Sequence, residues 1–424
     1  LLASKVAGNV LLDGAKSVAK GEKLNRQSLI MSSKNIENLA EQLAQLRGAA
    51  MKLGQLLSMD SGELLPPELS QLLARLRSDG HAMPHKQLVS VFKSQWGEGW
   101  LDKLSYIELK PFAAASIGQV HKANLENGEA LAIKVQYPGI AKSIESDVDN
   151  LASLLKLSGL LPKHIDIDPL IAEAKQQLLD EADYEREADF LKVYQRYLAP
   201  FAQFKVPQTY PELSTKQVLA MEFVDGIDLD ECVELNQAQR DNLARDLIQL
   251  FFYELLQFNT VQTDPNFANY LYQPASETVV LLDFGATRLL SKVICDGYFK
   301  LFAGAIANDE KEIALAAEQI GYFDSQIDEH YKKNVLNIFK LACEPLLIDE
   351  AYDFAASPLA RHIRDKGLEM STQKQQWHSP PIDALFVHRK LAGLYLIAAK
   401  LNAKVNVYQL YQAFLADYES ASTT

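Results

Sequence analysis

The chain has 424 residues, 48% of them hydrophobic, and a formal net charge of −13. This length exceeds one ordinary domain, and the apolar content is enough for a substantial core. The negative charge and the lack of a basic, aromatic-rich patch argue against nucleic acid as a partner. The cysteines are scattered without a Cys-x-x-Cys pair, which indicates a reducing compartment rather than a disulfide framework.

Residues 1 to about 100 carry a helical pattern. An apolar stripe with spacings of three and four runs from Leu39 to Leu57. On an adjoining face, Lys52 and Gln55 are three positions apart and are therefore neighbours. Taken alone, this pair is typical of an exposed helix end.

No run approaches the roughly 18 to 20 apolar residues of a membrane span. The first residue is Leu1 rather than methionine. We therefore expect the chain to be a piece of a longer product, from which a targeting or anchoring segment could be missing.

Residues 104–136 form the predicted β-rich part. Two predicted strands, 119–125 and 131–135, flank Asn127-Gly128, a pair that tolerates the positive φ of tight hairpins. Lys134 lies in the second of these strands. The segment before the hairpin, 111–119, is rich in alanine and is predicted to be a loop.

Residues 137–200 return to a helical pattern, with a strongly acidic helix predicted over 179–189. Several of its carboxylates are typical of a solvated face. Glu187 within it is the expected partner of Lys134. Farther on, residues 218–226 predict a strand that breaks at Asp225-Gly226. From residue 236 onward the pattern is helical except around 262–286.

The exceptional segment carries the most informative motifs. An apolar run ends in Asp283-Phe284-Gly285, and Asp264 and Asn269 form an Asp-x4-Asn loop upstream. This arrangement is the one by which kinase-like folds hold Mg²⁺ against nucleotide phosphates. Carboxylate and amide oxygens suit such a hard cation. We predict that Asn269 and Asp283 are metal ligands and that Asp264 is catalytic.

A kinase-like site also needs a strand lysine that reaches the phosphates, held by a carboxylate. Lys134 and Glu187 fill these two roles. Residues 218–226 then occupy the place of the hinge, so an adenine edge is expected to meet backbone groups near Glu222 and Val224.

The chain departs from ordinary protein kinases in three respects. The phosphate loop has Ala113, Ala114, Ala115 and Ser116 where glycines are usual, and alanine does not freely adopt positive φ. Gln-Thr-Asp replaces His-Arg-Asp before the catalytic aspartate, and no Ala-Pro-Glu follows Gly285. The usual platform for a peptide substrate is therefore absent.

With these motifs the chain resembles the UbiB family of atypical kinase-like proteins, also called aarF-domain kinases. Members carry an alanine-rich loop, a Lys-x-Gly-Gln motif in an N-terminal helical extension and a Glu-x-Asp motif. Here these are residues 113–116, Lys52-Leu53-Gly54-Gln55 and Glu181-Ala182-Asp183. The resemblance runs from about residue 40 to about residue 290. Beyond it the chain matches only in being helical.

The resemblance implies an α+β, two-lobed, mostly helical kinase-like fold with an N-terminal helical extension over the cleft. The expected parts are the extension at 1–103, a small lobe at 104–224 and a large helical lobe at 225–424. It also implies ATP or ADP with Mg²⁺ or Mn²⁺ as ligands, and work on isoprenoid lipids of the ubiquinone type. Expected partners are an isoprenoid lipid or membrane surface and ubiquinone-biosynthesis proteins. The expected location is the bacterial cytoplasm or the mitochondrial matrix side, peripheral to a membrane.

Three functions remain open at this point. The first is an atypical kinase or ATPase that assists isoprenoid-lipid metabolism. The second is a kinase acting on a small molecule or protein, whose protein form is disfavoured by the missing peptide platform. The third is a nucleotide-binding pseudokinase scaffold, disfavoured by the complete set of Lys134, Asp264, Asn269 and Asp283.

A last hypothesis concerns the extension. Lys52 and Gln55, assigned to the catalytic machinery by the resemblance, are expected to pack near Glu181 and Asp183 as a lid that excludes protein substrates. A half-buried lysine requires such carboxylate partners.

Overall fold

The computed structural model describes residues 82–115, 117–158, 168–323, 327–359, 361–363, 365–366 and 380–422. The chain forms two compact units, neither of which is one continuous stretch. One unit comprises residues 1–84, 114–119 and 136–182, and the other comprises residues 85–113, 120–135 and 183–424. The three-part division expected from the sequence stays a prediction.

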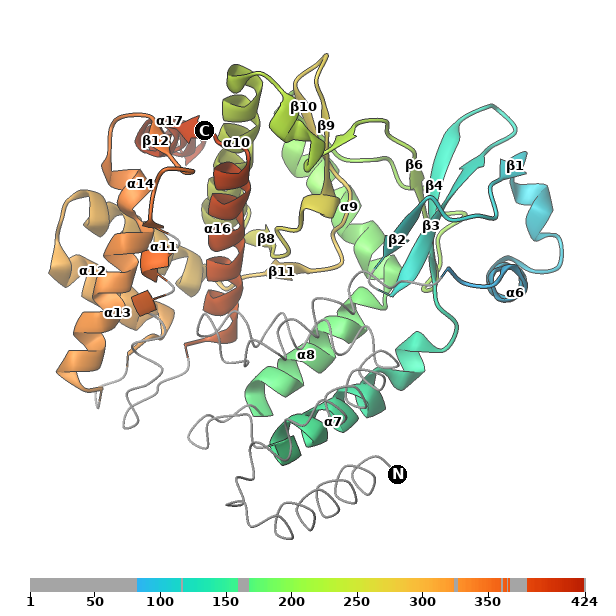
Figure 1. The fold of residues 1–424 in the computed structure, drawn as a ribbon, viewed down its shortest axis with the longest axis horizontal. Coiled ribbons are helices and arrows are strands. Elements are labelled where there is room, and N and C mark those ends of the chain that lie inside the picture. Colours follow the sequence, from blue (N-terminus) through green and yellow to red (C-terminus); the bar gives the residue numbers. More distant parts are fainter. Residues whose placement is uncertain are drawn as a thin grey trace, which may run out of the picture. The chain divides into compact units, whose positions relative to one another are not determined.

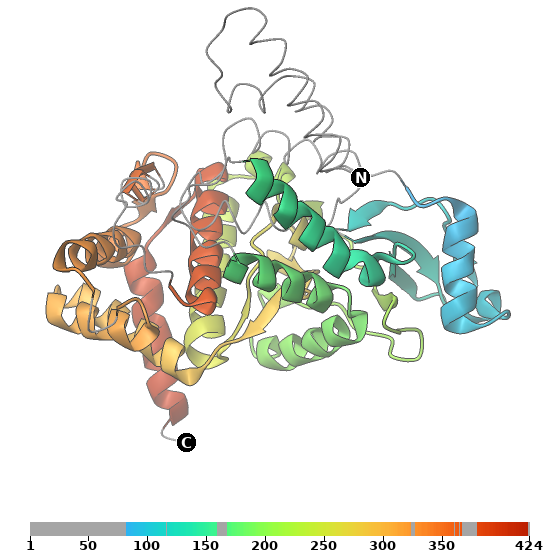
Figure 2. The ribbon, with the colours of Figure 1, turned by 90° about the horizontal axis from the view of Figure 1, so that it is seen from below.

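In the first unit, two long helices lie side by side, α7 (Ile140–Ser158) and α8 (Asp168–Glu181) (Figure 2). Leu170, Ala174 and Leu178 recur at every fourth position of α8 and are buried, as expected for a helix with one apolar face. The helical pattern predicted for this part of the chain is confirmed.

The second unit begins with α6 (His85–Trp96) and the 3-10 turn η1 (Trp100–Lys103). The chain then forms a sheet in the order β1-β3-β4-β6, with β2 paired to β3. The strands are β1 (Tyr106–Ile107), β2 (Ala113–Ala115), β3 (Gly118–Asn124), β4 (Ala130–Gln136) and β6 (Val218–Glu222).

The turn between β3 and β4 is the predicted hairpin turn. Gly128 has a φ of +87°, which glycine adopts without strain. The Asn127 side chain accepts a 3.0 Å hydrogen bond from the Glu129 amide and so closes the turn locally. The prediction of a loop throughout 111–119 is wrong, because residues 113–115 pair as a strand.

The acidic segment is not one helix, so the prediction of a single helix over 179–189 is also wrong. Helix α8 ends at Glu181, and a second helix, α9, spans Tyr184–Leu198. The Asp183 side chain accepts a hydrogen bond from the Arg186 amide as the N-cap of α9. Aspartate is preferred at this position because its side chain accepts a hydrogen bond from a backbone amide that has no partner within the helix.

Two small sheets organise the segment between residues 204 and 289. One has the order β5-β10-β9-β7 and the other pairs β8 with β11. Their strands are β5 (Phe204–Lys205), β7 (Ile227–Asp228), β8 (Thr260–Gln262), β9 (Tyr270–Gln273), β10 (Thr278–Leu281) and β11 (Thr287–Leu289). The pairing of β8 with β11 sets Gln262 opposite Thr287, which brings the two motif-bearing loops together.

The remainder is mainly helical, with α16 and α17 both packed against α10 (Figure 1). The elements are η2 (Glu231–Glu234), α10 (Gln237–Phe252), the π-helical turn η3 (Tyr253–Gln257), η4 (Phe267–Asn269), α11 (Lys292–Ile306), α12 (Glu310–Ile320), α13 (Glu329–Ala342), α14 (Glu344–Leu347), β12 (Tyr352–Asp353), α16 (Ile382–Lys400), β13 (Lys404–Val405) and α17 (Val407–Ser422).

Aromatic side chains fill the space between these helices. The Phe252 ring, at the end of α10, lies 5.3 Å from Tyr411 and 6.3 Å from Phe414 of α17, and 6.1 Å from Phe302 of α11, between ring centroids. Within the part of the chain that the structure describes, no helix combines the length and apolar character of a membrane span.

Candidate active site

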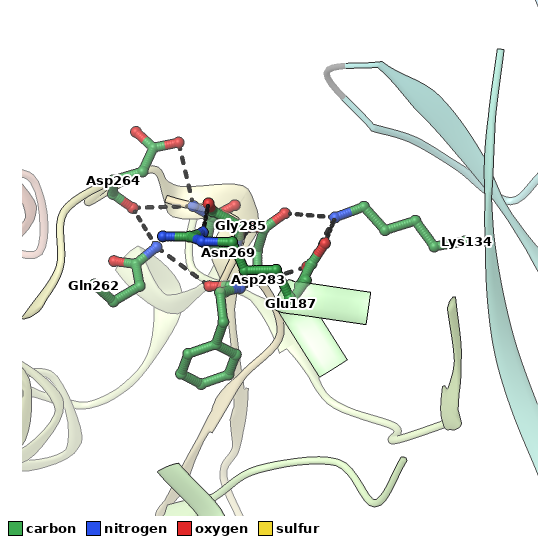
Figure 3. A network of polar contacts seen from close by, with 9 residues as sticks. Lys134, Glu187, Gln262, Asp264, Asn269, Asp283 and Gly285 are labelled. Carbon is green, nitrogen blue, oxygen red and sulfur yellow. Dashed lines mark hydrogen bonds and ion pairs between the residues drawn. The ribbon is translucent and has the colours of Figure 1, made fainter. Parts of the chain in front are cut away.

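A buried ion pair lies at the centre of the site. Lys134 of β4 donates to both carboxylate oxygens of Glu187, each at 2.9 Å, and its Nζ lies 3.0 Å from Asp283 Oδ2 (Figure 3). The side chains of Lys134 and Glu187 are 8% and 1% exposed. Glu187 reaches this place because it falls on the buried face of α9, in register with Tyr184, Leu191 and the other inward residues.

The electrostatics of this cluster favour a charged lysine. Burial opposes the charge of Lys134, but the carboxylates of Asp283 and Glu187 outweigh it and raise its pKa well above the usual value. Burial, with a smaller contribution from Asp283, raises the pKa of Glu187 to about 7 against the opposing attraction of Lys134. The raised pKa of Lys134 favours its charged form, whereas the raised pKa of Glu187 disfavours the carboxylate. The geometry supports the charged pair, because both Glu187 oxygens accept from the one ammonium.

The strand β10 delivers Asp283 to this cluster. Asp283 Oδ1 accepts a 3.0 Å hydrogen bond from the Gly285 amide, which orients the carboxylate. Phe284 is fully buried, with its ring 4.5 Å from that of Tyr194. Arg186 holds the segment from the other side, donating to the carbonyls of Gly285 and Thr287 at 3.1 and 2.7 Å. The Asp-Phe-Gly turn is therefore fixed at both ends.

The second motif folds into a tight loop beside the first. Asn269 Nδ2 donates to the Asp264 carbonyl at 2.9 Å and lies 3.4 Å from Asp264 Oδ2. The Leu282 amide donates to the Asn269 carbonyl at 3.0 Å, which joins the loop to the end of β10. The Asn269 amide nitrogen is thus turned to Asp264 (Figure 3), and its oxygen is the atom that a cation can use.

The donor set fits a magnesium ion. Asp283 supplies a carboxylate and Asn269 an amide oxygen, both hard ligands. Among the described residues, no cluster of three or more histidine, cysteine, aspartate or glutamate side chains could hold a metal by itself. A cation here would complete its shell with water and phosphate oxygens, as Mg²⁺ does in nucleotide sites.

Sequence reasoning missed the contribution of α16. The Arg389 guanidinium forms an ion pair with the Asp264 carboxylate. Its neighbour Lys390 is fully buried and lies 3.2 Å from Gln262 Oε1 and 3.1 Å from the Tyr270 hydroxyl. A lysine inside an apolar helical stretch was the available signal, because a buried ammonium requires partners.

Gln262 and Glu254 complete that buried network. Gln262 Nε2 donates to the carbonyls of Asp264 and Asp283 at 3.1 and 3.3 Å, so one amide spans both motifs (Figure 3). The Glu254 carboxylate accepts hydrogen bonds from the Tyr194 hydroxyl at 2.7 Å and from the backbone amide of Gln262 at 3.2 Å. It also lies 3.4 Å from the Lys390 ammonium. Burial raises the pKa of Glu254, partly offset by Lys390.

The remaining predicted residues either belong to the elements named below or fall outside the described residues. Ala113, Ala114 and Ala115 form β2, while Ser116, Lys52 and Gln55 are outside the described residues. Glu181 ends α8, and Asp183 caps α9. Their expected pairing with the extension stays a prediction.

The hinge segment is partly engaged in the sheet. The Glu222 amide donates to the Gln208 carbonyl at 2.7 Å, and the Phe223 amide to the Ala130 carbonyl at 2.9 Å. The Glu222 side chain pairs with Lys205 at 2.6 Å. Val224, the next residue, is buried.

Comparison with known proteins gives a consistent assignment. Residues 75–317 match the family model described as the ABC1 atypical kinase-like domain. The chain is 36% identical to the mitochondrial atypical kinase COQ8B of Rattus norvegicus, over 91% of this chain and 72% of that protein. It is 34% identical to the mitochondrial atypical kinase COQ8 of Saccharomyces cerevisiae, over 98% of this chain and 83% of that protein.

A solved structure shares the fold. A Mycobacterium tuberculosis protein, solved in complex with erythromycin, matches with a TM-score of 0.60 over 89% of this chain and 96% of its own, at 22% identity. This likeness concerns the architecture alone.

Proposed function

The chain belongs to the ABC1 atypical kinase-like family, and on this basis we propose that it binds Mg–ATP or Mg–ADP and hydrolyses ATP or transfers its terminal phosphoryl group in isoprenoid-lipid metabolism. The family assignment confirms the resemblance to the UbiB proteins and the α+β, mostly helical kinase-like fold. The observation that carries the proposal is the convergence of Glu187 and Asp283 on the Lys134 ammonium, at 2.9 and 3.0 Å.

Each residue has a distinct part in the proposed reaction. Lys134, fixed by Glu187, would neutralise phosphate oxygens. Asp283 and Asn269 would hold Mg²⁺, which when bound neutralises charge on the phosphates and orients them. Asp264 would accept the proton of the attacking oxygen. The β2 alanines would approach the phosphates, and the Val224 backbone would meet the adenine, because the Glu222 amide is already engaged.

The substrate side of the proposal rests on the family. The resemblance implies ubiquinone-type lipids, and the relatives' names place those proteins in mitochondria. We propose an isoprenoid lipid or membrane surface and ubiquinone-biosynthesis proteins as partners, on the matrix side of mitochondria or in the bacterial cytoplasm. The lid hypothesis, in which Lys52 and Gln55 pack near Glu181 and Asp183, belongs to this proposal too.

The first test is magnesium-dependent nucleotide binding. Thermal-shift titration with ADP and ATP, with Mg²⁺ or with a chelator, compares the wild type with Asp283→Asn. The matched control is Asp296→Asn, because Asp296 is a partly exposed aspartate that pairs with Lys292 on α11. We expect Mg²⁺-dependent stabilisation in the wild type and the control and its loss in Asp283→Asn. Equal stabilisation of all three would refute the metal assignment.

The second test separates hydrolysis, phosphoryl transfer and a scaffold role. Phosphate release is measured with and without anionic liposomes containing a polyprenyl-phenol mimic, and labelled γ-phosphate is followed into lipid and protein. Phosphate release stimulated by the liposomes supports an ATPase. Label in lipid or protein supports a kinase, and nucleotide binding without either supports a scaffold.

A further inference from the structure

The ion pair between Arg389 and Asp264 joins the proposed catalytic base to a distant part of the chain. Arg389 lies on α16, beyond residues 75–317 that match the family model. The two side chains are 10% and 20% exposed, so the pair is largely shielded from water. A charge-assisted hydrogen bond in such surroundings holds its acceptor more firmly than one on the open surface.

The two oxygens of Asp264 have different neighbours. Oδ1 accepts from Arg389, whereas Oδ2 lies 3.4 Å from Asn269 Nδ2, on the side of the proposed metal ligand. With Oδ1 held, rotation of the carboxylate is restricted, and Oδ2 stays beside Asn269. Residues 262–269 contain no lysine or arginine, so the loop itself offers no cation for this purpose.

Helix α16 is anchored to the same loop at two further points. Lys390 contacts Gln262, whose side chain spans the carbonyls of Asp264 and Asp283. Gly393 lies so close to Pro265 that an added Cβ would stand 2.1 Å from the proline Cγ. The contacts of Lys390 and Gly393 therefore fix the position of the helix that carries Arg389 relative to the Asp264 loop.

We propose that Arg389 is a positioning residue for phosphoryl transfer or hydrolysis, acting through Asp264. In that step the attacking oxygen bonds to the γ-phosphorus, the bond from that phosphorus to the bridging oxygen of ADP breaks, and the attacking group's proton passes to Asp264 Oδ2. Arg389 holds Oδ1 and so keeps Oδ2 aligned. This inference rests on the proposed function.

The test is a double-mutant cycle in the full chain, with single-turnover rates of phosphate release for the wild type, Arg389→Gln, Asp264→Asn and the double variant. Lys292→Gln is the matched control, because it removes a cation from an exposed ion pair with Asp296 on α11. We expect Arg389→Gln to slow the reaction by about 10- to 100-fold and to leave the Kd of Mg–ADP within about twofold. The double variant should be no slower than Asp264→Asn.

A structural role would give a different pattern. If Arg389→Gln slowed the reaction equally with Asp264 present and in the Asp264→Asn background, or left the wild-type rate unchanged, the inference would be overturned. If Arg389→Gln does not fold, Arg389→Lys serves instead, because it keeps the charge but loses the planar fork. It should slow the reaction by about 3- to 10-fold with Asp264 present, and an equal loss in the Asp264→Asn background would again refute the role.

Failure of the proposed function is visible separately. A wild type that neither releases phosphate nor transfers label to lipid or protein faster than Asp264→Asn would overturn the proposed function and this inference together. Wild-type turnover that Arg389→Gln leaves unchanged overturns the inference alone.

Discussion

At the residue scale, the Lys134–Glu187 pair has separable effects on stability and on function. Both side chains are nearly inaccessible to water. Removing one partner leaves the other desolvated and unpaired, whereas replacing both by apolar groups can restore stability. The pair therefore offers a way to lose function while keeping the fold.

We predict that Lys134→Met lowers the free energy of unfolding by about 3 kcal/mol and abolishes nucleotide binding. Lys134→Met/Glu187→Leu should recover most of the stability and none of the binding. Urea unfolding and nucleotide thermal shift are the two measurements. A double variant less stable than the single one would contradict this account of the pair.

The single variant should also acquire a pH dependence. In the wild type burial raises the pKa of Glu187 to about 7 despite Lys134. Without the lysine, only the hydrogen bond from the Phe284 amide still lowers this pKa. A raised carboxyl pKa in the folded state means that stability is greatest below the unfolded value and is lost as pH rises. The free energy of unfolding of Lys134→Met should thus fall between about pH 5 and pH 8, relative to that of Lys134→Met/Glu187→Leu. Parallel stability curves would refute this.

At the element scale, α16 contacts the loop that carries Asp264, the proposed catalytic residue, at Arg389, Lys390 and Gly393. Alanine usually stabilises a helix by up to about 1 kcal/mol relative to glycine. Gly393→Ala would therefore stabilise α16 if the helix could move away from Pro265. Here the new Cβ would lie 2.1 and 2.6 Å from two atoms of the Pro265 ring. The clash outweighs the propensity gain, because overpacking a tight contact costs about 1–3 kcal/mol.

We therefore predict that Gly393→Ala lowers both the melting temperature and phosphate release. Ala392→Ser adds one atom at the adjacent exposed position and serves as the control. Thermal unfolding and turnover are measured on both. A more stable Gly393→Ala variant with normal turnover would show that the helix and loop are not rigidly coupled.

The same helix carries a histidine that should weaken the fold in acid. Burial lowers the pKa of His388 to about 4. Its Nε2 lies 2.8 Å from the Tyr322 hydroxyl, and a neutral ring can accept a hydrogen bond from that hydroxyl. For a base with a lowered folded-state pKa, stability is complete above the unfolded value and is lost as pH falls. The loss between about pH 6.5 and pH 4 should reach about 2–3 kcal/mol.

The comparison of His388→Phe with the wild type isolates this effect from the titrating carboxylates. We expect the difference in unfolding free energy between the two proteins to change over that pH range in favour of the variant. His330→Gln, at an exposed position on α13, should follow the wild type. A constant difference for His388→Phe would refute the assignment.

The elements that the sequence predicted well are those with local signals. The Asn127-Gly128 hairpin needs only a turn that tolerates positive φ, and the observed φ of Gly128 meets it. The break between α8 and α9 was missed because helix-forming acidic residues surround Asp183, whose capping bond appears only in the folded chain. Arg389 was missed for a related reason, since its pairing with Asp264 spans 125 positions and leaves no local pattern.

At the scale of the whole molecule, neither compact unit is a continuous stretch of sequence. Composition and periodicity find boundaries along the chain, so they could not predict a division whose parts interleave. The family model likewise ends at residue 317, although α16 and α17 pack on α10 beyond that point. The packing of α10 and the contacts of the Asp264 loop therefore both involve the last part of the chain.

We predict that a chain truncated after residue 323 does not fold cooperatively. It would expose Phe252, whose ring contacts Tyr411 and Phe414 of α17, and would leave Glu254 buried without Lys390. Losing a packed aromatic side chain and losing a buried charge partner each cost about 3–5 kcal/mol. Together these losses are comparable to the net stability of an ordinary domain, about 5–15 kcal/mol.

The measurements are near-ultraviolet circular dichroism, thermal unfolding and binding of a hydrophobic dye. Phe414→Ala in the full chain is the intermediate case: it should lose about 3–5 kcal/mol yet unfold in one sharp transition. Leu396→Ala, at an exposed leucine of α16, should resemble the wild type. Should the truncated chain melt sharply and near the wild-type temperature, the segment matched by the family model would fold without α16 and α17, and the role of α16 would be confined to aligning the catalytic loop.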